Sequence, residues 1–212
     1  MSVGSEQTVL IVLRGNSASG KSAIARTVRE RYGRGIAIVG QDNLRRVVLR
    51  EHDKPGAPNV GLIGMVARYA LDAGYHVVVE GILSAAHYSD MLAGLCADHR
   101  GLTRCYYLDV PFEETLRRHQ TKPPAEYGQP EMSDWYRERD FLPGGIEQII
   151  TAETSLEAAV DRIVRDTGLV PREQLARAVR PRPTAPVTAF AALSPVPASR
   201  RGFYPVMRRG KG

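Results

Sequence analysis

Eight consecutive residues near the start of the chain have the types and spacing of a loop that holds phosphate groups. They are Gly15, Asn16, Ser17, Ala18, Ser19, Gly20, Lys21 and Ser22, which together read G-x-x-x-x-G-K-S. The glycines let the backbone curl around a phosphate so that successive N–H groups point inward. Lys21 would then reach the β- and γ-phosphates, and Ser22 would place its hydroxyl on Mg²⁺. The motif predicts binding of a nucleoside triphosphate.

The residues on either side of this loop favour phosphate binding over the alternative, an ordinary glycine-rich turn. The apolar run 9–13 before the loop predicts a buried strand, and the helix-forming residues 23–26 follow it. A helix that starts here would direct its positive N-terminal end at the bound anion.

Three acidic residues, Asp42, Glu80 and Asp109, come at the ends of predicted strands. Asp42 is the candidate general base, because a carboxylate facing the loop can accept the hydroxyl proton of a second substrate. The alternative is that Asp42 only caps the following helix. Three possibilities stay open for Glu80: it holds Mg²⁺ through water, it hydrogen-bonds the acceptor, or it does neither. Asp109 is better explained as part of a turn before the next helix.

Basic residues bracket a segment rich in proline and glycine, residues 122–145, which is predicted to be a mobile lid. The candidates are Arg117, Arg118, Lys122, Arg137 and Arg139. A lid that closes brings positive charge onto the phosphates and excludes water. We expect Arg118 and Arg137 to contact phosphate, whereas the alternative for each residue is an ordinary surface charge.

The elements that must position these residues alternate between strand and helix. Strands are predicted at 9–13, 36–39, 76–80, 104–110 and 148–151, and helices at 23–32, from 43, at 62–71, 85–99, 112–121, 131–139 and 155–166. This alternation predicts a parallel sheet with helices on both faces and right-handed crossovers. Ligands of such sheets bind beyond the carboxyl ends of the strands, where the loop and the three acids would gather.

Charge divides the chain into two parts. The chain carries 29 Lys and Arg, 23 Asp and Glu, and a net charge of +6. Residues 171–212 hold nine of the basic residues, one acidic residue and seven of the 14 prolines. We therefore expect one domain at 1–170, close to neutral and not a nucleic-acid binder, and a disordered basic tail at 171–212. The tail either contacts an acidic partner or is a loose appendage.

Other features bound the cellular setting. The sequence has no run of about 18 apolar residues that would span a membrane, and its start lacks the pattern of a signal peptide. Cys96 and Cys105 have no metal or redox spacing, which favours reduced thiols in a cytoplasmic protein.

With these residues identified, the chain resembles the P-loop kinases of small molecules, in particular the chloramphenicol phosphotransferase, zeta-toxin and gluconate kinase groups, which are often described as AAA-type predicted kinases. The resemblance spans about residues 8–168 and depends on the phosphate-binding loop, Asp42, the strand end at Glu80 and the stretch 108–118. It implies a three-layer α/β/α P-loop NTPase fold with a five-stranded parallel sheet in the order 2-3-1-4-5 and an arginine-bearing lid. Related chains often carry arginine before the lid proline, where this chain has Lys122, which lacks the bidentate fork.

The predicted activity is that of an ATP- and Mg²⁺-dependent kinase acting on a hydroxyl of a small molecule such as an antibiotic, a sugar or a nucleoside. Asp42 would act as base, Lys21, Arg118 and Arg137 would stabilise charge, and Ser22 and Glu80 would serve the metal.

Three alternatives stay open. The first is a kinase of nucleotide sugars, as in zeta toxins. The second is a nucleoside monophosphate kinase, with Arg45, Arg46 and Arg68 available for the acceptor phosphate. The third is a regulatory ATPase that switches a partner through the basic tail.

Overall fold

The computed structural model describes residues 2–121 and 127–170, which lie within one compact unit, Met1–Ala178. The predicted tail at 171–212, Lys122 and the first part of the predicted lid fall outside the described residues. The domain limit at residue 170 therefore stays a prediction.

Five strands form one sheet whose neighbouring strands all run parallel, in the order β2-β3-β1-β4-β5. They are β1 (Val9–Gly15), β2 (Ile36–Gly40), β3 (His76–Glu80), β4 (Leu102–Asp109) and β5 (Glu147–Thr151). The central strand β1 is buried along its whole length. The predicted α/β class, strand count and strand order are confirmed.

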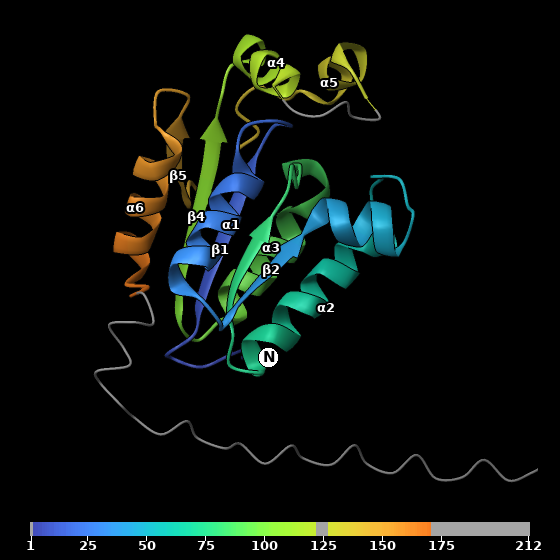
Figure 1. Ribbon diagram of the computed structural model, residues 1–212. Helices are drawn as coiled ribbons and strands as arrows, with labels where there is room; N and C mark the ends of the chain where they lie inside the picture. The colour runs from blue at the N-terminus through green and yellow to red at the C-terminus, as the bar shows by residue number, and fades with distance from the viewer. Residues whose placement is uncertain (1, 122–126, 171–212) are drawn as a thin grey trace, which may run out of the picture. The chain divides into compact units, whose positions relative to one another are not determined.

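Helices connect the strands and cover both faces of the sheet (Figure 1). They are α1 (Lys21–Tyr32), the π-helix η1 (Asn43–Val48), α2 (Pro58–Asp72), α3 (Ala85–Asp98), α4 (Phe112–Gln120), α5 (Gln129–Trp135) and α6 (Leu156–Thr167). Helices α4 and α5 lie beyond the carboxyl end of β4, above the loop that follows β1 (Figure 1).

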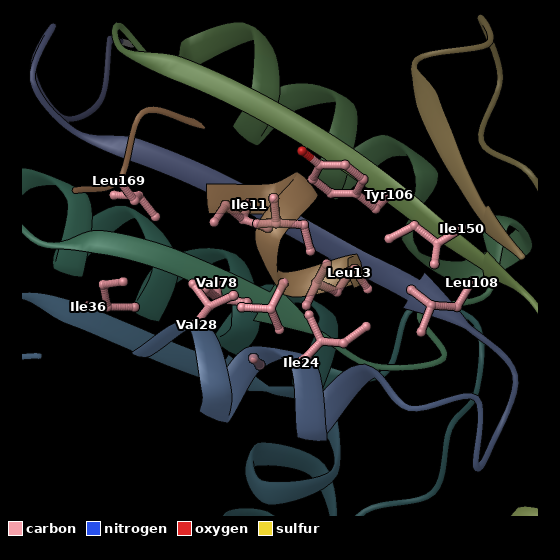
Figure 2. Close-up of a cluster of buried hydrophobic side chains, with 14 of the residues drawn as sticks. Ile11, Leu13, Ile24, Val28, Ile36, Val78, Tyr106, Leu108, Ile150 and Leu169 are labelled. Atoms are coloured by element: carbon pink, nitrogen blue, oxygen red, sulfur yellow. The ribbon is translucent and has the colours of Figure 1, made fainter. Parts of the chain in front are cut away.

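Two apolar clusters hold the three layers together. On one face of the sheet, Ile11 and Leu13 of β1 pack against Ile24 and Val28 of α1 and against α6 (Figure 2). On the other face, side chains of β1 and β3 pack against α2 and α3. Successive strand residues point to opposite faces of the sheet, so β1 contributes side chains to both clusters. The strands are thereby fixed, and with them the carboxyl edge where the predicted site lies.

Two helices differ from their predicted limits. Helix α5 ends at Trp135 rather than near residue 139, because Tyr136 takes an extended conformation. Helix α2 begins at Pro58, four residues before its predicted start, with the proline in the first turn where its missing N–H costs nothing. None of the helices among residues 2–121 and 127–170 is long and apolar enough to cross a membrane.

Candidate active site at the carboxyl edge of the sheet

The phosphate-binding loop has several residues with positive φ values, as in backbones that bind anions. Gly15 has a φ of 142°, and a Cβ there would lie 2.7 Å from the carbonyl oxygen of Leu108. Ala18 and Gly20 also have positive φ values, 57° and 111°. Alternation of left-handed and right-handed residues turns successive N–H groups to one side. The first turn of α1, which follows directly, has no acidic residue to compete with an anion.

Lys21 lies within the loop rather than in solvent. Its Nζ donates to the carbonyl oxygen of Asn16 at 2.7 Å and to the Ser19 hydroxyl at 3.2 Å. The side chain therefore crosses the concave side of the loop, where a phosphate would lie.

Ser22 and Glu80 meet across the loop. The Ser22 hydroxyl donates to Oε2 of Glu80 at 3.0 Å, which joins the first turn of α1 to the end of β3. Burial raises the pKa of the Glu80 carboxyl, against the opposing effects of Lys21 and of the Ser22 hydrogen bond. A hydroxyl and a carboxylate are the hard oxygen donors that Mg²⁺ prefers, and Mg²⁺ takes its other ligands from water and phosphate. The pair fits such an ion.

Ser22 and Glu80 would supply only part of the coordination shell of a metal ion. Within the described part of the chain, no three His, Cys, Asp or Glu side chains gather as a metal site. Mg²⁺ commonly takes its remaining ligands from water and from substrate phosphates.

Asp42 stands at the neighbouring strand end. Gly40 pairs with Glu80 in the sheet, which brings the chain after β2 alongside the end of β3. The Asp42 charge contributes to the raised pKa of Glu80. The Asp42 side chain is 70% exposed and accepts from Nη2 of Arg45 at 3.1 Å. Asp42 occupies the N-cap position of η1, but its side chain makes no capping hydrogen bond there.

Arg118 is held in a fixed position beside the loop. Its guanidinium donates to the carbonyl oxygens of Ser19 at 2.9 Å and Ala152 at 3.0 Å, and to Glu114 at 2.7 Å. It thus ties α4 to the phosphate-binding loop and to the segment after β5. The protein contacts of Arg118 are two carbonyl oxygens and a carboxylate, and its predicted contact with phosphate stays a prediction.

A cavity of about 300 Å³ opens next to Arg118, between α1, α4 and the segment that joins β5 to α6. Its apolar lining includes Ile24, Leu108 and Ile150, and Glu114 and Arg118 line its polar side. The cavity therefore adjoins Gly20 of the phosphate-binding loop and suits a flat, partly apolar group.

Arg137 lies against the loop through its backbone. Its N–H donates to Oδ1 of Asn16 at 2.9 Å, and its carbonyl oxygen accepts from Nδ2 of Asn16 at 2.8 Å. The guanidinium donates to the carbonyl oxygens of Asp134 and Tyr136 at the end of α5. Arg137 is next to the loop as expected, and contact with phosphate would require its side chain to turn.

Tyr127 is a residue near the site that the sequence analysis did not single out. Its hydroxyl lies 3.3 Å from that of Ser17, and its ring stacks on His119 and contacts Trp135. Arg46 of η1 lies over the same ring, 5.7 Å from its centre. Tyr127 therefore bridges the predicted lid, the phosphate-binding loop and η1. Nothing in the sequence distinguishes this tyrosine, because its contacts come from three separate segments.

A buried polar network supports the residue before Asp42. Gln41 accepts from the Leu83 N–H at 3.0 Å and donates to Asp53 and to the Tyr88 hydroxyl. The Tyr88 hydroxyl donates to Asp53 at 2.8 Å and accepts from Asn59 at 2.6 Å. These bonds hold the segment before α2 against the carboxyl edge of the sheet. The sequence analysis missed the network, since polar residues on loops and helices give no periodic signal.

Two further predicted residues have other surroundings. Asp109 lies 3.7 Å from Nε of Arg139, and the cap position of α4 belongs to Pro111. Arg68 is paired with Asp98 at 2.6 Å, which joins α2 to the end of α3. Asp98 is the last residue of α3, next to the start of β4, so Arg68 lies toward the opposite edge of the sheet from the phosphate-binding loop.

The sheet order, the loop between β1 and α1, and the acidic residues at the ends of β2 and β3 define a P-loop nucleotide-binding protein of the α/β class. The chain belongs to the AAA_33 family, a family of AAA domains, whose model matches residues 10–142. A comparison with curated proteins finds no match.

Solved structures share this fold, among them two of small-molecule kinases. The APS kinase CysC of Mycobacterium tuberculosis, solved with AMPPNP and APS, is 20% identical with a TM-score of 0.58, covering 78% of this chain and 98% of its own. The tunicamycin resistance protein of Deinococcus radiodurans is 17% identical with a TM-score of 0.58, covering 77% and 98%. A gluconokinase of Sinorhizobium meliloti is 16% identical with a TM-score of 0.55, covering 83% and 98%. At these identities the likeness establishes the fold of P-loop small-molecule kinases.

Proposed function

We propose that this protein is an ATP-dependent phosphotransferase that moves the γ-phosphate to a hydroxyl group of a small molecule. The observation that carries the proposal is the position of Asp42 and Glu80 at neighbouring strand ends, with Glu80 bonded to Ser22 of the phosphate-binding loop. This arrangement offers a triphosphate cradle, a metal position and an exposed carboxylate together. The fold shared with an APS kinase and a gluconokinase supports the same activity.

The transfer itself needs a base for the acceptor hydroxyl and positive groups that stabilise charge on the phosphate oxygens. The Asp42 carboxylate accepts the proton of the acceptor hydroxyl as the acceptor oxygen forms its bond to the γ-phosphorus. The bond from the γ-phosphorus to the bridging oxygen breaks, and ADP leaves with that electron pair. Lys21 and the loop N–H groups stabilise the charge on the phosphate oxygens, and Arg118 and Arg137 are the further candidates for this role.

Ser22 and Glu80 are the residues that would hold Mg²⁺, the first through its hydroxyl and the second through water. When bound, the ion neutralises negative charge on the β- and γ-phosphates. A bound cation would oppose the effect of burial, which raises the pKa of the Glu80 carboxyl.

The cavity beside Arg118 is the proposed place of the nucleotide base. It lies directly beyond Gly20, so a nucleotide whose phosphates occupy the loop would direct its base there. Its apolar wall of Ile24, Leu108 and Ile150 suits a purine ring, and the flat guanidinium of Arg118 can pack on its edge.

The acceptor would lie between Asp42, η1 and Tyr127. An antibiotic, a sugar or a nucleoside are the candidate acceptors. A nucleotide-sugar or nucleoside monophosphate kinase is the second proposal, favoured by Arg45, which bonds Asp42, and by Arg46, which lies over the Tyr127 ring. Arg68 is withdrawn from this alternative, because its partner Asp98 lies at the end of α3.

A mass-spectrometric screen tests the proposal. The full chain is incubated with MgATP and a mixture of small metabolites and antibiotics, and compounds that gain one phosphate are sought. Asp42→Asn should lower transfer at least a hundredfold and leave the ADP dissociation constant within about twofold. Asp90→Asn, an exposed carboxylate on α3, is the matched control. Partner-stimulated phosphate release without a phosphorylated product would instead favour a regulatory ATPase, and unchanged turnover in Asp42→Asn would remove Asp42 from the mechanism.

A further inference from the structure

Arg14, the residue immediately before the phosphate-binding loop, is a charged side chain with no solvent exposure. Its Nε donates to the carbonyl oxygen of Leu83 at 2.8 Å. Its Nη1 donates to Glu147 at 2.8 Å, and its Nη2 to Asp140 at 2.9 Å. A guanidinium buried this deeply needs partners in its fixed fork geometry. The three bonds therefore specify where Asp140 and Glu147 lie relative to β1.

One of these carboxylates, Asp140, belongs to the segment that returns from the predicted lid, and the other, Glu147, is the first residue of β5. We name residues 136–142, between the end of α5 and β5, the return segment. Asp140 lies inside it, and Glu147 accepts from its Leu142 N–H at 2.6 Å. Asp140 also accepts from the Ala85 N–H at the start of α3 at 2.8 Å. One buried arginine thus joins the return segment to β1 and, through Asp140, to α3.

The phosphate-binding loop holds the same segment at a second point. The Asn16 amide pairs with both the N–H and the carbonyl oxygen of Arg137. Asn16 and Arg14 flank Gly15, so the two residues on either side of this glycine both bond to the return segment. Tyr107 of β4 adds a third support, since its hydroxyl lies between Arg137 and Asp140, 3.4 Å from the Arg137 carbonyl oxygen and 3.2 Å from the Asp140 N–H.

We propose that Arg14 is a positioning residue for phosphoryl transfer, which through Asp140 holds the return segment against the phosphate-binding loop and keeps the Arg137 backbone on Asn16, from where its side chain can turn to the transferred phosphate. The proposal rests on the phosphotransferase function argued above. Transfer rates depend steeply on such placement, because a shift of about 1 Å in a charge-stabilising group can cost a hundredfold. Arg14 acts only through Asp140 and Arg137, because its own guanidinium is buried and each of its three nitrogen atoms donates to another part of the protein.

Asp140 is the better residue to change, because replacing the fully buried Arg14 puts folding itself at risk. Asp140→Ala removes the acceptor, and Asp140→Asn keeps an oxygen for Arg14 and Ala85. Asp98→Ala is the matched control, since Asp98 also bonds one arginine, Arg68, and its side chain is 29% exposed against 21% for Asp140. Asp98 lies at the end of α3 and has no role in the proposed site.

Two measurements are made on the full-length variants: hydrogen exchange in the peptide that covers 136–142, and steady-state release of phosphate from MgATP. In Asp140→Ala, exchange at 136–142 should rise above that in Asp98→Ala. The turnover number should fall at least about tenfold, with the KM for ATP within about threefold. Asp140→Asn should restore most of the turnover number and most of the protection from exchange at 136–142. A general loss of stability would not give this rescue.

The possible results separate this inference from the proposed function. Unchanged exchange at 136–142 in Asp140→Ala overturns it, and so does raised exchange with an unaltered turnover number. An equal fall in turnover in Asp98→Ala also overturns it, because the effect would then be one of stability. Wild-type protein that releases no phosphate from MgATP and phosphorylates no acceptor would contradict the phosphotransferase function. A rise in exchange in Asp140→Ala would then retain Arg14 and Asp140 as the anchor of the return segment but not as an aid to transfer.

Discussion

The Ser22 hydroxyl bonds to the carboxylate of Glu80 at 3.0 Å, although the two residues are 58 positions apart in the chain. The bond exists because β1 and β3 are neighbours in the sheet, with Leu13 opposite Glu80. The first turn of α1 therefore meets the end of β3 at the point where a metal bound to a triphosphate would lie. This pair makes the proposed metal position testable without knowledge of the acceptor.

Glu80→Gln should reduce the contribution of Mg²⁺ to nucleotide affinity by about tenfold or more, a size typical of residues that orient metal-bound water. The glutamine oxygen can still accept from Ser22, so the fold should be retained. Titration calorimetry with ADP, in Mg²⁺ and in EDTA, measures the effect, which should appear only in Mg²⁺. Glu157→Gln, an exposed carboxylate on α6, is the control. Equal weakening in both buffers would remove Glu80 from the metal position.

Lys21→Ala should raise the dissociation constant for ATP at least about tenfold, because a charged donor to the phosphates is lost from the centre of the loop. Lys54→Ala, on an exposed loop before α2, provides the comparison and should bind ATP normally. Fluorescence titration with a labelled ATP analogue measures both. Normal binding by the Lys21 variant would contradict the phosphate-binding assignment of the loop.

Arg118→Met should lower the free energy of unfolding by about 1–3 kcal/mol, since two carbonyl oxygens lose their shared donor beside the cavity. Nucleotide affinity should fall as well, because Ser19 belongs to the phosphate-binding loop. Arg117 on the same helix is 68% exposed and bonds Glu114, so Arg117→Met should change either quantity much less. Urea denaturation measures the free energy of unfolding of both variants, and calorimetry measures their nucleotide affinity. A larger effect at Arg117 would contradict the structural role of Arg118.

His76 should make the stability of the protein depend on pH. Burial lowers the pKa of the His76 imidazole, whose Nδ1 accepts from the Val9 N–H at 3.0 Å. The unfolded chain then binds the proton near pH 6.5, while the folded protein does so only at lower pH. The unfolded state holds more protons in that interval, so stability should fall as the pH is lowered below about 6.5.

His76→Asn keeps an oxygen that can accept from Val9 but cannot titrate, so its stability should vary less with pH. Urea midpoints between pH 5 and 8 measure the slope. Tyr32→Phe removes the hydroxyl that lies 2.9 Å from Nε2 and leaves the titrating ring, so its pH dependence should persist. His99, whose pKa burial also lowers, should keep some slope in the asparagine variant. An unchanged slope in His76→Asn would refute the assignment.

The sequence alone determined the elements whose signals are local. The phosphate-binding motif, the β-branched strands and the acidic residues at strand ends are all readable within a few residues. They predicted the sheet, the nucleotide loop and the gathering of Asp42 and Glu80 at one edge. These predictions hold because parallel strands joined by right-handed crossovers leave few alternative arrangements.

Only the tertiary structure decided what each charged side chain contacts. Arg14 reads as an interruption of an apolar strand, yet it is the buried partner of Asp140, which lies 126 residues away. Cys96 and Cys105 have no redox spacing, yet their sulfur atoms lie 3.9 Å apart between α3 and β4. Arg118 and Arg137 were predicted from charge alone, and the structure places their guanidinium groups on backbone carbonyls near the loop. A long side chain can satisfy its charge in several directions, and the packing of distant segments selects one of them.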